Sequence, residues 1–214
     1  MKNKNTRKVS KNEITLRSRD NQNRSVRKNI FISCEGKTEK TYINSLKPYF
    51  NKVAVIKVKH DTRTSALDVV QNFETLFKNE VIEKSDIKFC VFDCDKNTDK
   101  QLSIATIKAD SEDKEILFSN PCFEIWLYWH FDKKIKNINQ DKLKDFISNE
   151  AGLKNYENDE QIYSKLIDKL YKAIDKAKKR EQIVTEEGIE PISRASEPYS
   201  DMYKLIEYLK QLQG

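Results

Sequence analysis

The chain has few of the residues on which several common enzyme sites depend. Four glycines and two histidines occur among its 214 residues. The scattered glycines form no phosphate-binding loop, which argues against nucleotidyl transfer from a nucleoside triphosphate, as in primases. The histidines, His60 and His130, have no metal-ligand spacing with each other or with a cysteine, which argues against a zinc site or a histidine-based triad.

Long hydrophobic segments and paired cysteine motifs are missing as well. No stretch approaches the roughly 18 to 20 apolar residues that span a bilayer, and no apolar segment follows the N-terminal charges. The cysteines lie in or beside apolar runs, at spacings that match no zinc knuckle. We therefore expect a cytoplasmic protein with no membrane partner and with reduced, buried thiols. These thiols are Cys34, Cys90, Cys94 and Cys122.

Charge, in contrast, is abundant and unevenly distributed. Charged residues make up 35% of the chain and hydrophobic residues 37%, with a net charge of +6. Residues 1–28 hold ten lysines and arginines against two acidic residues, a net charge of +8, which leaves about −2 for the remainder. Such a basic N-terminal arm can pair with phosphates or simply keep the protein in solution, and both roles stay open.

After this arm, short β-like runs alternate with helical periodicity, which is typical of a βαβ series with a mainly parallel sheet. The alternating runs predict strands at 29–34, 53–60, 87–92 and 115–119. The helical runs predict helices at 38–50, closing near Pro48, at 65–79 and at 99–111. The fold class expected from this order is α/β.

The second half of the chain changes in composition. Asn120 and Pro121 are typical of a helix N-cap and a first helical residue, and the apolar helix that they would begin is expected to pack on the sheet. From residue 133 the chain is rich in Lys, Asn and Asp, and its periodicity is helical at 159–182 and 200–212. The expected organisation is a basic arm at 1–28, an α/β domain at 29–132 and a helical region packed on it at 133–214.

Acidic residues follow two of the predicted strands. Glu35 comes directly after the first strand, and Asp93 and Asp95 come after the third. The carboxyl ends of parallel strands meet at one edge of a sheet, so these side chains should lie at the same edge, and they converge if the two strands are neighbours. Crowded carboxylates repel unless they share protons or bind a divalent cation, and oxygen ligands favour Mg²⁺ or Mn²⁺. The natural chemistry of such a site is phosphoryl transfer or phosphodiester cleavage, with Gly36 allowing a phosphate to approach. Aspartates that merely cap helices would give the same pattern.

Three stretches resemble one known family: "CEGKTEKTYINSL" (34–46), "VFDCDKN" (91–97) and "SNPCFEIWLYWHF" (119–131). They are similar to RloB-like proteins, whose other branch is AbiLii of abortive-infection systems, and the third stretch is the most distinctive. Members of this family resemble TOPRIM domains. The resemblance implies a TOPRIM-like Rossmannoid domain with a mainly parallel sheet, followed by a helical C-terminal extension.

The resemblance also implies roles for single residues. Glu35 matches the TOPRIM glutamate, a general acid or base that also helps to hold metal, and Asp93 and Asp95 match the DxD ligands of Mg²⁺ or Mn²⁺. Glu39 occupies the second acidic position of the first motif. Two further residues, Asn120 and Glu124, match the NPxFE segment, for which the resemblance supplies no role.

The implied function is that of a metal-dependent TOPRIM-type nuclease, the toxic effector of an abortive-infection, anti-phage defence system. Its implied partners are an ABC/AAA-type ATPase encoded alongside and a nucleic acid, either RNA, with tRNA as a candidate, or DNA. The alternative is a module without catalysis that recognises a nucleic acid or a phage component and signals to the ATPase.

Further residues are candidates for contact with nucleic acid. His60 follows the second strand and would lie at the same sheet edge as Glu35. Arg194 aligns with an arginine of the family, although Glu197 replaces the asparagine expected nearby. The basic candidates are Lys37, Lys96, Lys178, Lys179, Arg180 and Arg194.

Overall fold

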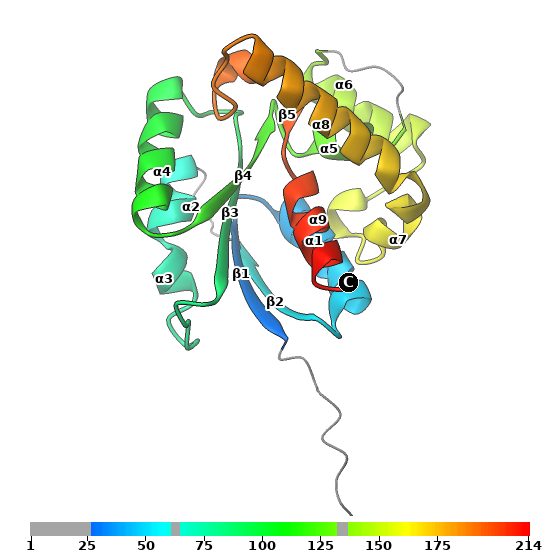
Figure 1. Ribbon diagram of the computed structural model, residues 1–214. Helices are drawn as coiled ribbons and strands as arrows, with labels where there is room; N and C mark the ends of the chain where they lie inside the picture. Colours follow the sequence, from blue (N-terminus) through cyan, green and yellow to red (C-terminus); the bar gives the residue numbers. More distant parts are fainter. Residues whose placement is uncertain (1–26, 61–64, 132–136) are drawn as a thin grey trace, which may run out of the picture.

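A five-stranded sheet with helices on both faces forms the centre of the molecule (Figure 1). The computed structural model describes residues 27–60, 65–131 and 137–214. The predicted basic arm, 1–28, lies almost wholly outside the described residues. The strands are β1 (Lys28–Cys34), β2 (Ala54–His60), β3 (Ile87–Asp93), β4 (Glu115–Asn120) and β5 (Tyr199–Ser200).

The strand order is β2-β1-β3-β4-β5. The first four strands are mutually parallel, and β5 is antiparallel to the end of β4. The predicted α/β class with a mainly parallel sheet is thus confirmed, and the arrangement is consistent with a Rossmannoid fold. Because β1 and β3 are neighbours, the residues that follow Cys34 and Val91 emerge at the same edge.

Helices cover the sheet in two layers. The helices before residue 132 are α1 (Lys37–Phe50), α2 (Ala66–Gln71), α3 (Phe73–Leu76), α4 (Asp99–Ser111) and α5 (Glu124–Tyr128). Those after it are α6 (Gln140–Asp145), α7 (Ile162–Leu166), α8 (Leu170–Glu186) and α9 (Tyr203–Gln211). Short π or 3₁₀ turns occupy Phe146–Glu150, Tyr156–Asn158, Ile167–Lys169 and Arg194–Ser196. Within the described ranges, no helix is long and apolar enough to cross a membrane.

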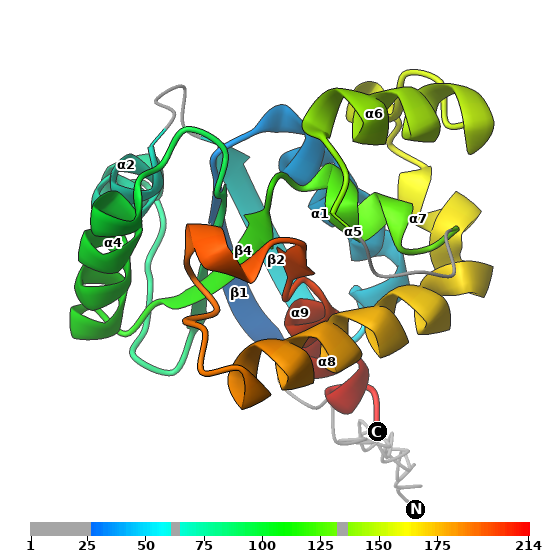
Figure 2. The ribbon, with the colours of Figure 1, turned by 90° about the horizontal axis from the view of Figure 1, so that it is seen from above.

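The alternation of side chains along β1 divides the core in two. Ile30 and Ile32 point into a large cluster with α1, α5 and α9, whereas Phe31 points into a smaller cluster with α2, α3 and α4. The view from above shows α2 and α4 on one side of the sheet and α1, α5 and α9 on the other (Figure 2). The large cluster joins residues from both halves of the chain, so the C-terminal helices complete the core of the sheet domain.

The predicted N-cap at Asn120 is wrong. Asn120 is the last residue of β4, and its Nδ2 donates to the carbonyl oxygen of Ser193 at 2.9 Å. The peptide bond to Pro121 is cis, and α5 begins at Glu124. The expectation that this apolar segment packs on the sheet is confirmed, because Trp126 and its neighbours are fully buried.

Other boundaries differ because local geometry interrupts the periodic pattern. Pro48 does not close its helix but lies within the last turn of α1, where its missing N–H removes one hydrogen bond. The helix predicted over 65–79 is split at Asn72, whose ψ of 2° leaves the helical range. The helix predicted over 159–182 is interrupted by the 3₁₀ turn Ile167–Lys169. The short β5 was not among the predicted strands, and its second residue, Ser200, begins the segment predicted as a helix over 200–212.

Candidate carboxylate site

A small cavity of about 190 Å³ opens at the carboxyl ends of β1 and β3. Its wall comes from the β1–α1 turn, the end of β3, the start of α5, and the C-terminal region at α6 and residue 157. Four carboxyl side chains of the sheet domain line it, namely Glu35, Glu39, Asp93 and Glu124. The structure therefore brings together acidic residues that are up to 89 positions apart in the chain.

Asp93 and Glu35 are adjacent at the centre of this cavity. The backbone N–H of Asp93 donates to Oε2 of Glu35 at 3.2 Å. The Oδ1 atom of Asp93 is buried and has no hydrogen-bond partner among the described residues. An orphaned buried oxygen is costly, which marks a position that a proton or a ligand would satisfy.

Gly36 gives space to a side chain of the protein itself. A Cβ atom added to Gly36 would lie 3.0 Å from Cδ of Glu39 and closer still to its Oε2. Glu39 lies in the first turn of α1 and is 3% exposed. The space beside Gly36, expected to admit a phosphate, is therefore filled by the carboxyl group of Glu39.

Glu124 is held by the C-terminal region. Its Oε1 accepts a hydrogen bond of 2.9 Å from the hydroxyl of Tyr156, which lies in a 3₁₀ turn. Next to this turn, Oγ1 of Thr41 donates to the carbonyl oxygen of Glu157 at 2.9 Å, and Lys37 donates to the side chain of Asn158. No sequence signal indicated these contacts, because a lone tyrosine in a polar segment has no characteristic spacing.

Burial dominates the electrostatics of the cavity. It raises the pKa of Glu35 to about 7, and the charge of Asp95 adds to this, whereas the hydrogen bond from the Asp93 backbone lowers it. Burial likewise raises the pKa of Glu39 to about 7, with further increases from Glu124 and Glu35. The pKa of Asp93 is also well above its ordinary value, through burial and then through Glu39 and Glu124. At neutral pH the cluster is therefore partly protonated when no cation is bound.

The two aspartates of the DxD sequence have different surroundings. Asp95 is exposed on the turn after β3, outside the cavity lining. Arg194 holds this turn, because its Nη1 donates to the carbonyl oxygens of Asp95 at 3.2 Å and Asn97 at 2.9 Å. The side chain of Asn120 in turn fixes the segment that carries Arg194, by donating to the carbonyl oxygen of Arg194. Both Arg194 and Asn120 thus position backbone near the site.

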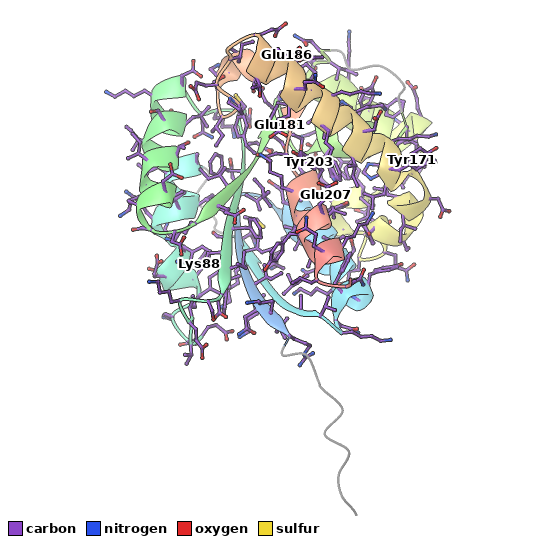
Figure 3. The ribbon with its side chains drawn as sticks, viewed as in Figure 1. Lys88, Tyr171, Glu181, Glu186, Tyr203 and Glu207 are labelled. Carbon is purple, nitrogen blue, oxygen red and sulfur yellow. The ribbon has the colours of Figure 1, made fainter. Side chains whose placement is uncertain are left out.

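The predicted basic contacts on α8 are engaged within the protein. Lys178 pairs with Glu207 of α9 and Lys179 with Asp175, while Nε of Arg180 donates to the carbonyl oxygen of Pro198 at 3.0 Å. Figure 3 shows Glu181, Tyr203 and Glu207 in this α8–α9 interface. These contacts leave fewer free cations on α8 than the sequence indicated.

Two other predicted residues lie near the strand ends. Lys96 is exposed and lowers the pKa of Glu35 through its charge, against the larger effect of burial. His60 ends β2, and its Nδ1 is 3.4 Å from Nζ of Lys40. It does not line the cavity.

The donor set fits a divalent cation in its chemistry. All candidate ligands are carboxylate oxygens, and Asp93 presents an orphaned one. Within the described ranges, however, no three acidic, histidine or cysteine side chains are gathered into a ready metal site. Binding a cation would therefore involve movement of side chains such as Glu35.

A larger cavity lies elsewhere and differs in character. It measures about 670 Å³ and runs along α4, β4 and residues 190–192. Lysines in its wall are already paired: Lys114 with Glu74 and Glu112, and Lys204 with Glu181. It is away from the carboxyl ends of the parallel strands, where ligands of α/β sheets usually bind, so the smaller cavity is the better candidate site.

Comparison with known proteins identifies a family. The model of a family described as RloB-like protein matches residues 30–209, which include the whole carboxylate cavity. No curated protein and no solved structure matches the chain. Since the match covers the sheet and the C-terminal helices alike, the chain belongs to the RloB-like family.

Proposed function

We propose that this protein is a Mg²⁺- or Mn²⁺-dependent phosphodiesterase that cleaves nucleic acid. The observation that carries the proposal is Asp93, a buried carboxyl at the end of a central parallel strand, with an orphaned oxygen facing three more carboxyl groups. A glutamate after the first strand and an aspartate after its neighbour are the arrangement expected of a TOPRIM-type site, which supports that relationship.

The residues of the cavity suit distinct tasks. Asp93 and Glu35 would hold the cation, with Asp95 as the third ligand from the adjacent turn. The bound cation would activate water and stabilise charge on the scissile phosphate. Glu39, with a pKa of about 7, can exchange a proton near neutral pH, as a general acid or base must. Tyr156 keeps Glu124 oriented toward these groups.

The biological role that we propose is that of a cytoplasmic toxic effector in abortive infection, related to AbiLii. Its partner would be an ABC/AAA-type ATPase encoded alongside, which holds the nuclease inactive or delivers it to its substrate. Support for this role comes from the family resemblance of three sequence motifs. Co-purification of the two tagged proteins, expressed together, tests the partnership directly.

The decisive experiment for the activity combines binding and cleavage. Calorimetry with Mn²⁺ should show one site in the wild-type protein and none in Asp93→Ala. Incubation of the wild-type protein with tRNA, single-stranded DNA and plasmid DNA should then show cleavage that EDTA and Asp93→Ala both abolish. An Asp93→Ala protein that keeps its protective effect against phage would favour the recognition module without catalysis.

A further inference from the structure

One wall of the carboxylate cavity is formed by helix α6, which belongs to the C-terminal region. Gln140 and Lys144 of α6 line the cavity together with Glu35, Glu39 and Asp93. The spacing of four residues puts both side chains on the same face of the helix. Sequence patterns drew attention to neither residue, since Lys144 is one of many lysines in a polar segment.

Lys144 differs from the other cations near the site. Lys37 also lines the cavity but donates to Asn158, and Lys40 is next to His60. Lys144 is half-buried, and no ion pair or hydrogen bond of its ammonium group is found within the described ranges. A partly desolvated lysine without a carboxylate partner, in a cavity that five acidic residues including Glu157 line, is available to bind an anionic group of a ligand.

The size of the cavity limits what that anion can be. Its volume of about 190 Å³ is below the roughly 300 to 1,000 Å³ of pockets that enclose a whole small ligand. A phosphodiester group fits such a space, whereas a complete nucleotide with its base would extend beyond it. The cavity therefore suits one phosphate of a longer chain, with the bases outside.

We infer that Lys144 and Gln140 form a phosphate subsite, in which they hold non-bridging oxygens of a nucleic-acid phosphodiester opposite the carboxylate cluster. This inference rests on the proposed phosphodiesterase function and deepens it. The substrate is an internal phosphodiester of a polymer, recognised without contact to the base at that position. Lys144 binds the phosphate, and Gln140 orients it by a hydrogen bond.

The test compares Lys144→Ala with a matched control, Lys142→Ala, which removes an exposed lysine from the same helix. The probe is a short fluorescent single-stranded DNA, and an RNA of the same sequence, bound in the presence of Ca²⁺ and followed by fluorescence anisotropy. Lys144→Ala should weaken binding about tenfold and reduce the slope of log K against log salt by about 1. Lys142→Ala should change neither quantity appreciably, and Lys144→Arg should restore most of the affinity.

Three outcomes overturn the inference. Equal affinity and equal salt slope in Lys144→Ala and wild type would remove Lys144 from the site. An equal loss in Lys144→Ala and Lys142→Ala would reduce its role to general charge. A preference of more than tenfold for one base composition would show that bases enter the cavity. Mn²⁺ calorimetry on the wild-type protein separates these from failure of the proposed function, because absence of Mn²⁺ binding in wild type would refute the metal site itself.

Discussion

Carboxyl groups cluster at two sites in this molecule. At one site they form ion pairs with a lysine, and at the other, among the described residues, they do not. Around Lys114, Glu74 and Glu112 share one buried ammonium group, with distances of 3.0 and 2.6 Å from its Nζ atom. In the cavity at the strand ends, Glu35, Glu39, Asp93 and Glu124 face one another, and no described lysine or arginine forms an ion pair with them.

This difference indicates that the charges around Lys114 stabilise the fold, whereas those in the cavity are available to a ligand. Lys114 also donates to the carbonyl oxygen of Val70 and lies 4.8 Å from the ring centroid of Phe73, so its position is fixed from several sides. Asp93 has an oxygen that nothing satisfies. A fold that leaves charges uncompensated at one place, while compensating them elsewhere, points to a cation or substrate as the missing partner.

The largest expected effect is on metal binding. Asp93→Asn should weaken Mn²⁺ binding at least 100-fold, about 2.7 kcal/mol, because the neutral amide removes a ligand at the centre of the cluster. Asp95→Asn should weaken it about tenfold, since Asp95 lies on the exposed turn. Calorimetry measures both, with Glu112→Gln as the control that should bind as wild type does. Equal losses in all three variants would mean that the cavity has no special role.

Lys114→Met tests the compensated group. It removes the shared cation and the hydrogen bond to Val70, so the free energy of unfolding should fall by about 2 to 3 kcal/mol while Mn²⁺ affinity stays unchanged. Urea denaturation measures the loss. Glu74→Gln should cost far less, because the side chain of Glu74 is 64% exposed. A loss of Mn²⁺ affinity in Lys114→Met would contradict the separation of the two sites.

The carboxyl groups of the cavity should make the stability of the fold depend on pH. The pKa values of Glu35 and Glu39, about 7 against an ordinary 4.5, mean that the folded protein holds protons that the unfolded chain releases. Their contribution is therefore complete below about pH 4.5 and is lost as the pH rises through about 7. Without divalent ions, wild type should lose about 2 kcal/mol more than Glu39→Gln between these limits. Urea denaturation across this pH range measures the difference in the free energy of unfolding. Parallel pH profiles of wild type and Glu39→Gln would refute the raised pKa of Glu39.

The smallest effect is expected at the link to the C-terminal region. Tyr156→Phe removes the hydrogen bond to Glu124 and should lower the free energy of unfolding by about 1 kcal/mol. Mn²⁺ affinity should change by less than about threefold, because Glu124 itself remains. Thermal denaturation gives the first quantity and calorimetry the second. Tyr171→Phe, at a position 66% exposed, is the matched control and should change neither.

The elements that carry the site were predictable because their signals are local. The runs that end at Cys34 and Asp93 have the apolar character of buried parallel strands, and the order of strands and helices specified a parallel sheet. The adjacency of β1 and β3 was not predictable from local signals, and only the family resemblance supplied the strand order that brings Glu35 near Asp93.

The contribution of the C-terminal region was not predictable in the same way. Lys144 and Tyr156 reach the cavity through tertiary packing, and no periodicity or spacing connects them to Glu124. Asn120 failed for a related reason: asparagine before proline is a common N-cap pair, but here the side chain bonds to residues 193–196, far along the chain. Local sequence patterns cannot predict a hydrogen-bond partner that is more than 70 residues away in the chain.

The close approach of Gly36 and Glu39 has a consequence for how the sequence can change. A Cβ atom at position 36 would overlap the carboxyl group of Glu39, so alanine there would displace the end of that side chain. The two positions are therefore coupled. In a library of random variants, alanine at position 36 should occur with a shorter residue at position 39 more often than with glutamate.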